Sequence, residues 1–133
     1  MSIRAIFDTH PKPIGGDRDA LIRCIDECAT CAADCTACAD ADLAEPDVQE
    51  MVRCIRLCVD CADLCVTTGR VAARQTERDD AVLRATVEAC RLACRACAEE
   101  CERHAHHHEH CRICAGTCRS CEQACEALLA TLS

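Results

Sequence analysis

The chain has 133 residues, of which 18 are cysteine, one is phenylalanine, and none is tryptophan or tyrosine. The length fits one domain. The formal net charge of −8 argues against a nucleic-acid partner and suits a protein that handles cations. Large hydrocarbon and aromatic side chains are too scarce to fill an ordinary core, so another residue type must fill the interior.

Residues 1–16 are predicted to form a flexible arm. Pro11, Pro13, Gly15 and Gly16 are expected to prevent a helix there. The arm is interrupted by charged residues and contains no apolar signal-peptide core, and no stretch of the chain approaches the ~18 apolar residues of a membrane span. We therefore expect a cytoplasmic protein whose thiols stay reduced.

The rest of the sequence, residues 17–133, predicts an all-α fold. Ala, Leu, Arg and Glu dominate it, and no alternating run of β-branched and aromatic residues indicates a strand. Breaks at Pro46, around Gly69 and before residue 108 separate four helices, expected near 17–43, 47–72, 78–105 and 108–131. Four helices with short connections predict an antiparallel up-down-up-down four-helix bundle.

The cysteines fall into four groups, one in each predicted helix, and within every group the spacing alternates between four and three. This average of 3.5 residues places each group on a single helix face, so we expect a cysteine-lined core. The groups are Cys24, Cys28, Cys31, Cys35 and Cys38; Cys54, Cys58, Cys61 and Cys65; Cys90, Cys94, Cys97 and Cys101; and Cys111, Cys114, Cys118, Cys121 and Cys125.

Metal binding explains this pattern better than packing or disulfides do. A core selected for stability would use Leu and Ile, which bury more apolar area. Cysteines three or four residues apart on one helix are poorly placed for the dihedral angle of a disulfide. Thiolates, by contrast, are soft ligands that select Cu(I), Zn(II) or iron–sulfur clusters.

Straight helices favour Cu(I) among these metals. Neighbouring cysteines on one helix supply two sulfurs and a facing helix supplies a third, which suits the low coordination number of Cu(I). If every sulfur bridges two ions, the capacity is on the order of 18 Cu(I) per chain, which leaves the dry core neutral. A general thiolate buffer for Zn(II), with about four to nine ions, stays an alternative. No cysteine is singled out as the partly exposed, low-pKa thiolate of a redox enzyme, so no catalytic activity is predicted.

The two ends of the predicted bundle differ. Continuing the cysteine spacing toward one end gives hydrocarbon side chains: Leu21, Leu83 or Val87, Leu128 and Leu132. Toward the other end it gives Met51, His104 and His108, while His110 adjoins the last cysteine group. Thioether and imidazole are also Cu(I) ligands, and a His-rich tract beside a thiol core is typical of metal binding. We therefore expect metal to enter at the Met51/His104/His108 end.

The four CxxxC/CxxC groups resemble the cysteine-rich four-helix-bundle copper storage proteins of bacteria, in particular their cytosolic branch, over about residues 20–126. The resemblance implies reversible loading of many Cu(I) ions, thiolate ligation by all eighteen cysteines, Met or His ligands at one open end, and a homotetramer. Two apolar stripes beside the cysteines either widen the core or form a subunit interface, and both interpretations stay open. The stripes are Val52, Ile55, Val59, Ala62 and Val66, and Ile22, Ile25, Ala29 and Ala32.

Overall fold

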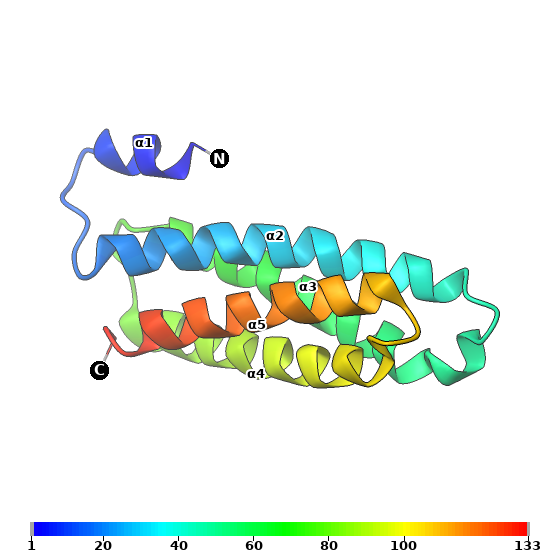
Figure 1. Cartoon of the computed structure of the whole chain (residues 1–133). Coiled ribbons are helices and arrows are strands. Elements are labelled where there is room, and N and C mark those ends of the chain that lie inside the picture. The colour runs from blue at the N-terminus through cyan, green and yellow to red at the C-terminus, as the bar shows by residue number, and fades with distance from the viewer. Residues whose placement is uncertain (1, 133) are drawn as a thin grey trace.

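The fold of the chain is given by a computed structural model that describes residues 2–132. Four long helices run antiparallel around one core, in the order α2–α3–α4–α5 (Figure 1). No strand is found within the described range, and the predicted four-helix bundle is confirmed. The elements are α1 (Ile3–Asp8), α2 (Arg18–Leu43), the 3-10 helix η1 (Val48–Glu50), α3 (Val52–Ala73), α4 (Asp80–His104) and α5 (Glu109–Leu129).

The N-terminal arm contains a short helix that the sequence did not predict. Helix α1 ends at Asp8, before the first proline, so the expectation that Pro and Gly exclude a helix from residues 1–16 is wrong for this part. The reason is that those residues all follow position 10 and act only on the segment that leads to α2. Phe7 is buried within the hydrophobic core cluster and anchors α1 to the bundle. Met1 of the arm and Ser133 of the bundle lie outside the described residues.

Helix α3 begins later than predicted. Residues 47–51, expected to form its first turns, instead contain the 3-10 helix η1, and α3 starts at Val52. A 3-10 helix is narrower than an α-helix, which lets the chain turn back after Pro46 within a few residues. The result is that Met51, just before α3, is fully buried.

The core is built from the seam that the sequence predicted. All eighteen cysteines are buried, in the order of the four groups along the four helices. At one end, Leu21, Leu83, Val87 and Leu128 are buried with Leu132, so hydrocarbon closes the bundle there as expected. We call this the closed end.

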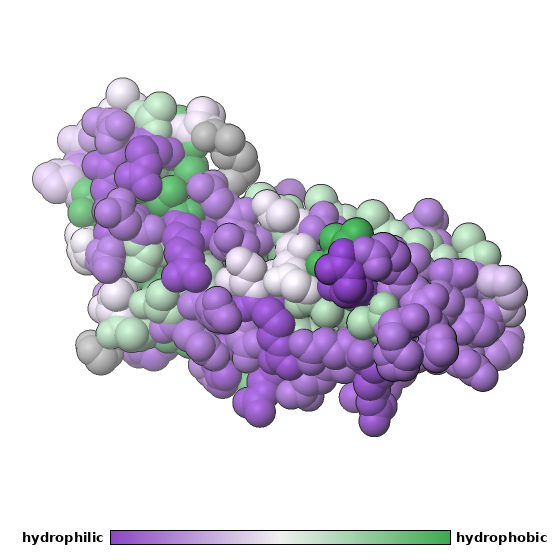
Figure 2. Space-filling view, in the orientation of Figure 1, coloured by the Kyte–Doolittle hydropathy of each residue, from purple (hydrophilic) through white to green (hydrophobic). Residues whose placement is uncertain are grey.

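The outside of the bundle is hydrophilic over most of the face shown in Figure 2, where apolar side chains form small separate patches. Arginine–carboxylate pairs are frequent on the helices, for example Arg119 with Glu102 on the neighbouring helix, at 2.8 Å. Within residues 2–132, none of the helices combines the length and the apolar content that a bilayer crossing requires.

Candidate metal centre

The thiols form a continuous column along the bundle axis. None of the eighteen is more than 1% exposed, and none forms a disulfide. Each cysteine lies on the inner face of its helix because the alternating spacing matches the helical repeat. Sulfur–sulfur distances between contacting cysteines run from 3.5 Å, between Cys35 and Cys118, to 4.0 Å, between Cys65 and Cys121.

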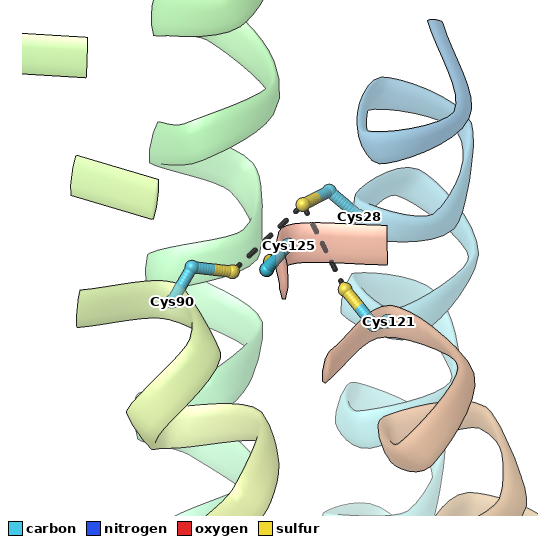
Figure 3. Close-up of side chains that lie close together, drawn as sticks. All are labelled: Cys28, Cys90, Cys121 and Cys125. Carbon is cyan, nitrogen blue, oxygen red and sulfur yellow. Dashed lines mark hydrogen bonds between the residues drawn. The ribbon is translucent and has the colours of Figure 1, made fainter. Parts of the chain in front are cut away.

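Four sulfurs near the closed end show how the helices share a site. Cys28 comes from α2, Cys90 from α4, and Cys121 and Cys125 from α5, and their side chains point toward one another (Figure 3). The Cys28 sulfur lies 3.8 Å from the sulfur of Cys90 and 3.8 Å from that of Cys121. All four sulfur atoms lie within 4.8 Å of one another, so one ion can contact several of them.

Such groups of four repeat along the bundle and overlap. Cys31 and Cys118 belong to one group with Cys61, and Cys118 also belongs to the next group with Cys97. A sulfur that belongs to two neighbouring groups is placed to bridge two ions. Five of the eight groups are Cys28/Cys90/Cys121/Cys125, Cys31/Cys65/Cys94/Cys121, Cys31/Cys35/Cys61/Cys118, Cys35/Cys97/Cys114/Cys118 and Cys38/Cys58/Cys101/Cys114.

The spacing of the sulfurs suits metal ligation without a large rearrangement. For a metal–sulfur bond of about 2.3 Å, the edge between two sulfurs is about 3.8 Å in a tetrahedral site and about 4.0 Å in a trigonal one. Contacting thiols in the core already lie 3.5–4.0 Å apart. The column is therefore a preformed set of soft ligands into which ions can be inserted as protons leave.

The thiols share their protons with one another. The hydrogen bond with Cys121 raises the pKa of Cys28, whereas the hydrogen bond with Cys118 lowers the pKa of Cys31. At the edge of the column, burial raises the pKa of Cys111. Where the pKa is raised, as for Cys28 and Cys111, the thiol stays neutral before metal binds, and metal must displace its proton.

The opposite end of the bundle, which we call the mouth, brings together the end of α2, η1, the start of α3, the end of α4 and the start of α5 (Figure 1). Of the residues predicted to receive metal there, Met51 is buried in the core cluster. The side chain of His104, the last residue of α4, contacts a residue of the same helix: its Nε2 lies 2.9 Å from Glu100 Oε2. The structure thus places Met51 and His104 at the mouth, with His104 held by a carboxylate.

His108 is surrounded by carboxylates. Its Nε2 lies 3.0 Å from Asp47 Oδ2, and its Nδ1 lies 2.8 Å from Glu45 Oε2. The hydrogen bond with Asp47 raises the pKa of His108, and the same bond lowers the pKa of Asp47. Both ring nitrogens are therefore engaged, and the ring must turn away from one carboxylate before it can bind a metal ion.

His110 is the histidine that reaches the thiols. Its Nδ1 lies 3.4 Å from the sulfur of Cys38 and 3.7 Å from that of Cys111, while its Nε2 lies 2.8 Å from Glu45 Oε2. An ionised carboxylate only accepts, so Nε2–H donates to Glu45 and the Nδ1 lone pair faces the sulfurs. A carboxylate that orients a histidine in this way is common beside metal sites.

Asp42 is a mouth residue that the sequence analysis missed. Its side chain is fully buried, and Oδ1 accepts from the Cys111 thiol at 3.5 Å. Burial raises the pKa of Asp42 to about 7. The signal was present in the spacing, because Asp42 follows Cys38 by four residues and so occupies the next seam position. The carboxylates of Glu45 and Asp47 lie off the seam, and only the folded loop after α2 brings them to the histidines, whereas Glu100 contacts His104 one turn along α4.

Comparison with known proteins identifies close structural relatives. A family model described as copper storage protein matches residues 17–130. The structure of the copper storage protein Ccsp from Streptomyces lividans, loaded with 10 copper equivalents, is 53% identical, with a TM-score of 0.96 over 97% of this chain and 98% of that one. A structure of copper loading to a cytosolic copper storage protein from the same organism, with five coppers, is 56% identical, with a TM-score of 0.86 over 87% and 97%. Among curated proteins, no sequence matched.

Proposed function

The chain belongs to the copper storage protein family, and on this premise we propose that it stores Cu(I) in the thiol column, with on the order of 18 ions per chain. The S. lividans relatives hold five and 10 copper equivalents in their structures. The higher figure here assumes that each ion takes two sulfurs and each sulfur bridges two ions. Thiolates supply the charge that Cu(I) neutralises, so a fully loaded core carries little net charge.

One observation carries this proposal: the groups of four sulfurs overlap along the axis. Separate sites would hold one ion each and would end at about four ions, whereas shared sulfurs allow ions to follow one another through the column. All eighteen thiols are buried, so the column favours retention of metal over the exposed thiol pair that a transfer protein would present.

Anaerobic titration with Cu(I) against a chromophoric Cu(I) chelator tests the capacity. We expect binding to continue to on the order of 18 ions per chain. A parallel titration with Zn(II) tests the alternative of a zinc buffer, for which full bridging gives about nine ions and no bridging gives about four. Saturation at four or fewer Cu(I) ions would contradict the storage proposal.

We further propose that Cu(I) enters at the mouth, where Met51, His104, His108 and His110 lie. The closed end offers only hydrocarbon side chains. The mouth offers a thioether and imidazoles beside the outermost cysteines of the column, such as Cys38. Of these groups, His110 has the most direct support, because its Nδ1 faces Cys38 and Cys111. His108 and His104 are held by carboxylates and would act after a ring rotation.

The triple substitution Met51→Ala, His104→Ala and His108→Ala tests this route. We expect slower Cu(I) uptake, measured by stopped-flow transfer from a Cu(I) chelate, with a capacity lower by a few ions at most. The matched control is His106→Ala with His107→Ala, because those two exposed rings belong to the same tract and face each other. Unchanged uptake in the triple variant would refute the role of these three residues.

We propose that the protein assembles as a homotetramer in the cytoplasm. The apolar stripe of α3 beside its cysteines is only partly buried. Ala62 is buried, whereas Val52, Val59 and Val66 are exposed by 62%, 44% and 43%. Exposed valines two turns apart on one helix support a subunit interface. Light scattering tests the mass, and Val59→Glu is expected to lower it. The cytoplasmic location rests on the S. lividans relative described as cytosolic.

We also propose that the chain binds metal without catalysing a reaction. A redox enzyme needs a thiolate that reaches its substrate, and every cysteine here is buried. Peroxide consumption by the fully reduced protein, compared with free cysteine at equal thiol concentration, tests this point. Catalytic turnover would contradict it.

A further inference from the structure

We propose that the mouth of the copper-free protein binds one divalent cation of the zinc class through Cys38, Asp42, His110 and Cys111. The site goes beyond Cu(I) storage, with which it shares Cys38 and Cys111. Its donors are two sulfurs, one nitrogen and one carboxylate oxygen, whereas the rest of the column offers sulfur alone.

Four of the six distances between these donor atoms match a tetrahedral site. His110 Nδ1 lies 3.4 Å from Cys38 Sγ, 3.7 Å from Cys111 Sγ and 3.6 Å from Asp42 Oδ1. Cys111 Sγ lies 3.5 Å from Asp42 Oδ1. With zinc bonds of about 2.0 Å to oxygen and nitrogen and about 2.3 Å to sulfur, tetrahedral edges are about 3.3–3.8 Å. The four measured edges fall within this range.

Asp42 is the residue that Cu(I) storage does not explain. A buried carboxylate costs free energy unless it is paired, and Asp42 is 0% exposed. Its Oδ2 has no hydrogen-bond partner among the described residues. Carboxylate is a hard ligand that suits Zn(II) and is a poor ligand for soft Cu(I). A divalent ion bound at Oδ1 would offset the charge of this carboxylate.

The surroundings hold the nitrogen donor in place. Glu45 Oε2 accepts from His110 Nε2 at 2.8 Å, which leaves Nδ1 directed at the site. Outer carboxylates of this kind orient histidine ligands and typically change metal affinity 10–100-fold. A surface hollow of about 140 Å³ is lined by two of the four donors, Cys38 and His110, together with Asp34 and other residues.

Proton displacement favours the mouth over the all-sulfur groups for the first divalent ion. A group of four cysteines must release four protons to form four thiolates around one ion, and an isolated site of that kind keeps a charge of −2 in a dry core. The mouth has only two thiols to deprotonate. With neutral His110 and ionised Asp42 it keeps a charge of −1, beside a histidine that is 28% exposed to solvent.

Zinc titration of the full-length, reduced, copper-free protein tests the proposal, with a chromophoric Zn(II) chelator as competitor. We expect one tight equivalent per chain, which Asp42→Ala weakens by more than about 100-fold, beyond the range for the loss of an outer-sphere partner. Asp40→Ala is the matched control, because Asp40 is an exposed carboxylate on the same helix, and it is expected to leave the tight equivalent unchanged.

Cobalt(II), a spectroscopic substitute for zinc, identifies the ligands. We expect the first equivalent to give the visible bands of a tetrahedral site with charge-transfer intensity for two thiolates, not four. Asp42→Asn, which keeps the side-chain shape, gives the same test if the alanine variant does not fold. If both variants retain the tight equivalent, or if the first Co(II) shows four thiolates, the proposal is wrong. The Cu(I) titration of the unmodified protein is independent of either outcome and tests storage separately.

Discussion

The two ends of the bundle continue the same cysteine seam with different chemistry. At the closed end the seam passes into Leu21, Leu83, Val87 and Leu128, all buried. At the mouth it passes into Asp42 and Met51, equally buried, with His110 beside them. The hydrocarbon end gains stability from burial alone, whereas the mouth keeps polar groups whose burial costs free energy unless they are paired.

The helix ends show the same contrast. Helices α2 and α4 begin at the closed end, and the carboxylates of Asp17 and Asp79 accept hydrogen bonds from the first-turn backbone amides. Helices α3 and α5 begin at the mouth, and neither Met51 nor His108 makes a side-chain cap. The caps thus secure the helix starts at the closed end, whereas the helix starts at the mouth have no side-chain cap.

Copper binding should reduce the difference in stability between the two ends of the bundle. Its effect on the stability of the protein is the largest that we expect. Each Cu(I) that binds only the folded protein adds about 4 kcal/mol to stability when free Cu(I) is 1,000 times its Kd. Even one such site should raise the Tm by more than about 10 °C, and removal with a Cu(I) chelator should reverse the rise. Differential scanning calorimetry under nitrogen measures it. A Tm that does not depend on copper would show that the metal is not held in the folded core.

Removing hydrocarbon from the closed end should destabilise the copper-free protein without changing its capacity. Leu83→Ala deletes a fully buried side chain of α4 and should cost about 3 kcal/mol in the free energy of unfolding. Leu92→Ala on the same helix is the control, because Leu92 is largely exposed and its loss should cost less than about 0.5 kcal/mol. Urea denaturation and Cu(I) titration of both variants separate the two roles. A reduced capacity in the Leu83 variant would contradict the division between the two ends.

The difference between the ends also explains how far the sequence could be interpreted. The bundle, its seam and the closed end follow from a periodicity that one helix carries by itself, so the prediction needed no tertiary information. Helix α1 depends on Phe7 finding a place on the folded bundle, which no local pattern specifies. The carboxylates around His108 and His110 come from a loop more than 60 residues away in sequence, and only the fold brings them together.

The buried carboxylate at the mouth should make stability depend on pH. Burial raises the pKa of Asp42 from 3.8 to about 7, so between these values the folded protein binds a proton that the unfolded chain has lost. Its stabilising contribution is therefore present below pH 4 and is lost as the pH rises through 7. Asp42→Asn removes this dependence and should make the copper-free protein more stable at pH 8 by on the order of 2 kcal/mol. Denaturation of both proteins from pH 4 to 8 measures the difference, and parallel pH profiles would contradict the assignment.

The smallest effect concerns the helix caps that distinguish the two ends. Asp79 accepts hydrogen bonds from the amides of Ala81 and Val82, each at 3.0 Å, so Asp79→Ala leaves two amides at the start of α4 without a protein partner. We expect a loss of about 1 kcal/mol, against no measurable change for Asp63→Ala, an exposed carboxylate in the middle of α3. Hydrogen exchange should show the same order in the unmodified protein, with the first turns of α3 and α5 exchanging faster than those of α2 and α4. Equal protection at all four helix starts would mean that buried Met51 and the carboxylates around His108 secure the mouth as firmly as the two capping aspartates secure the closed end.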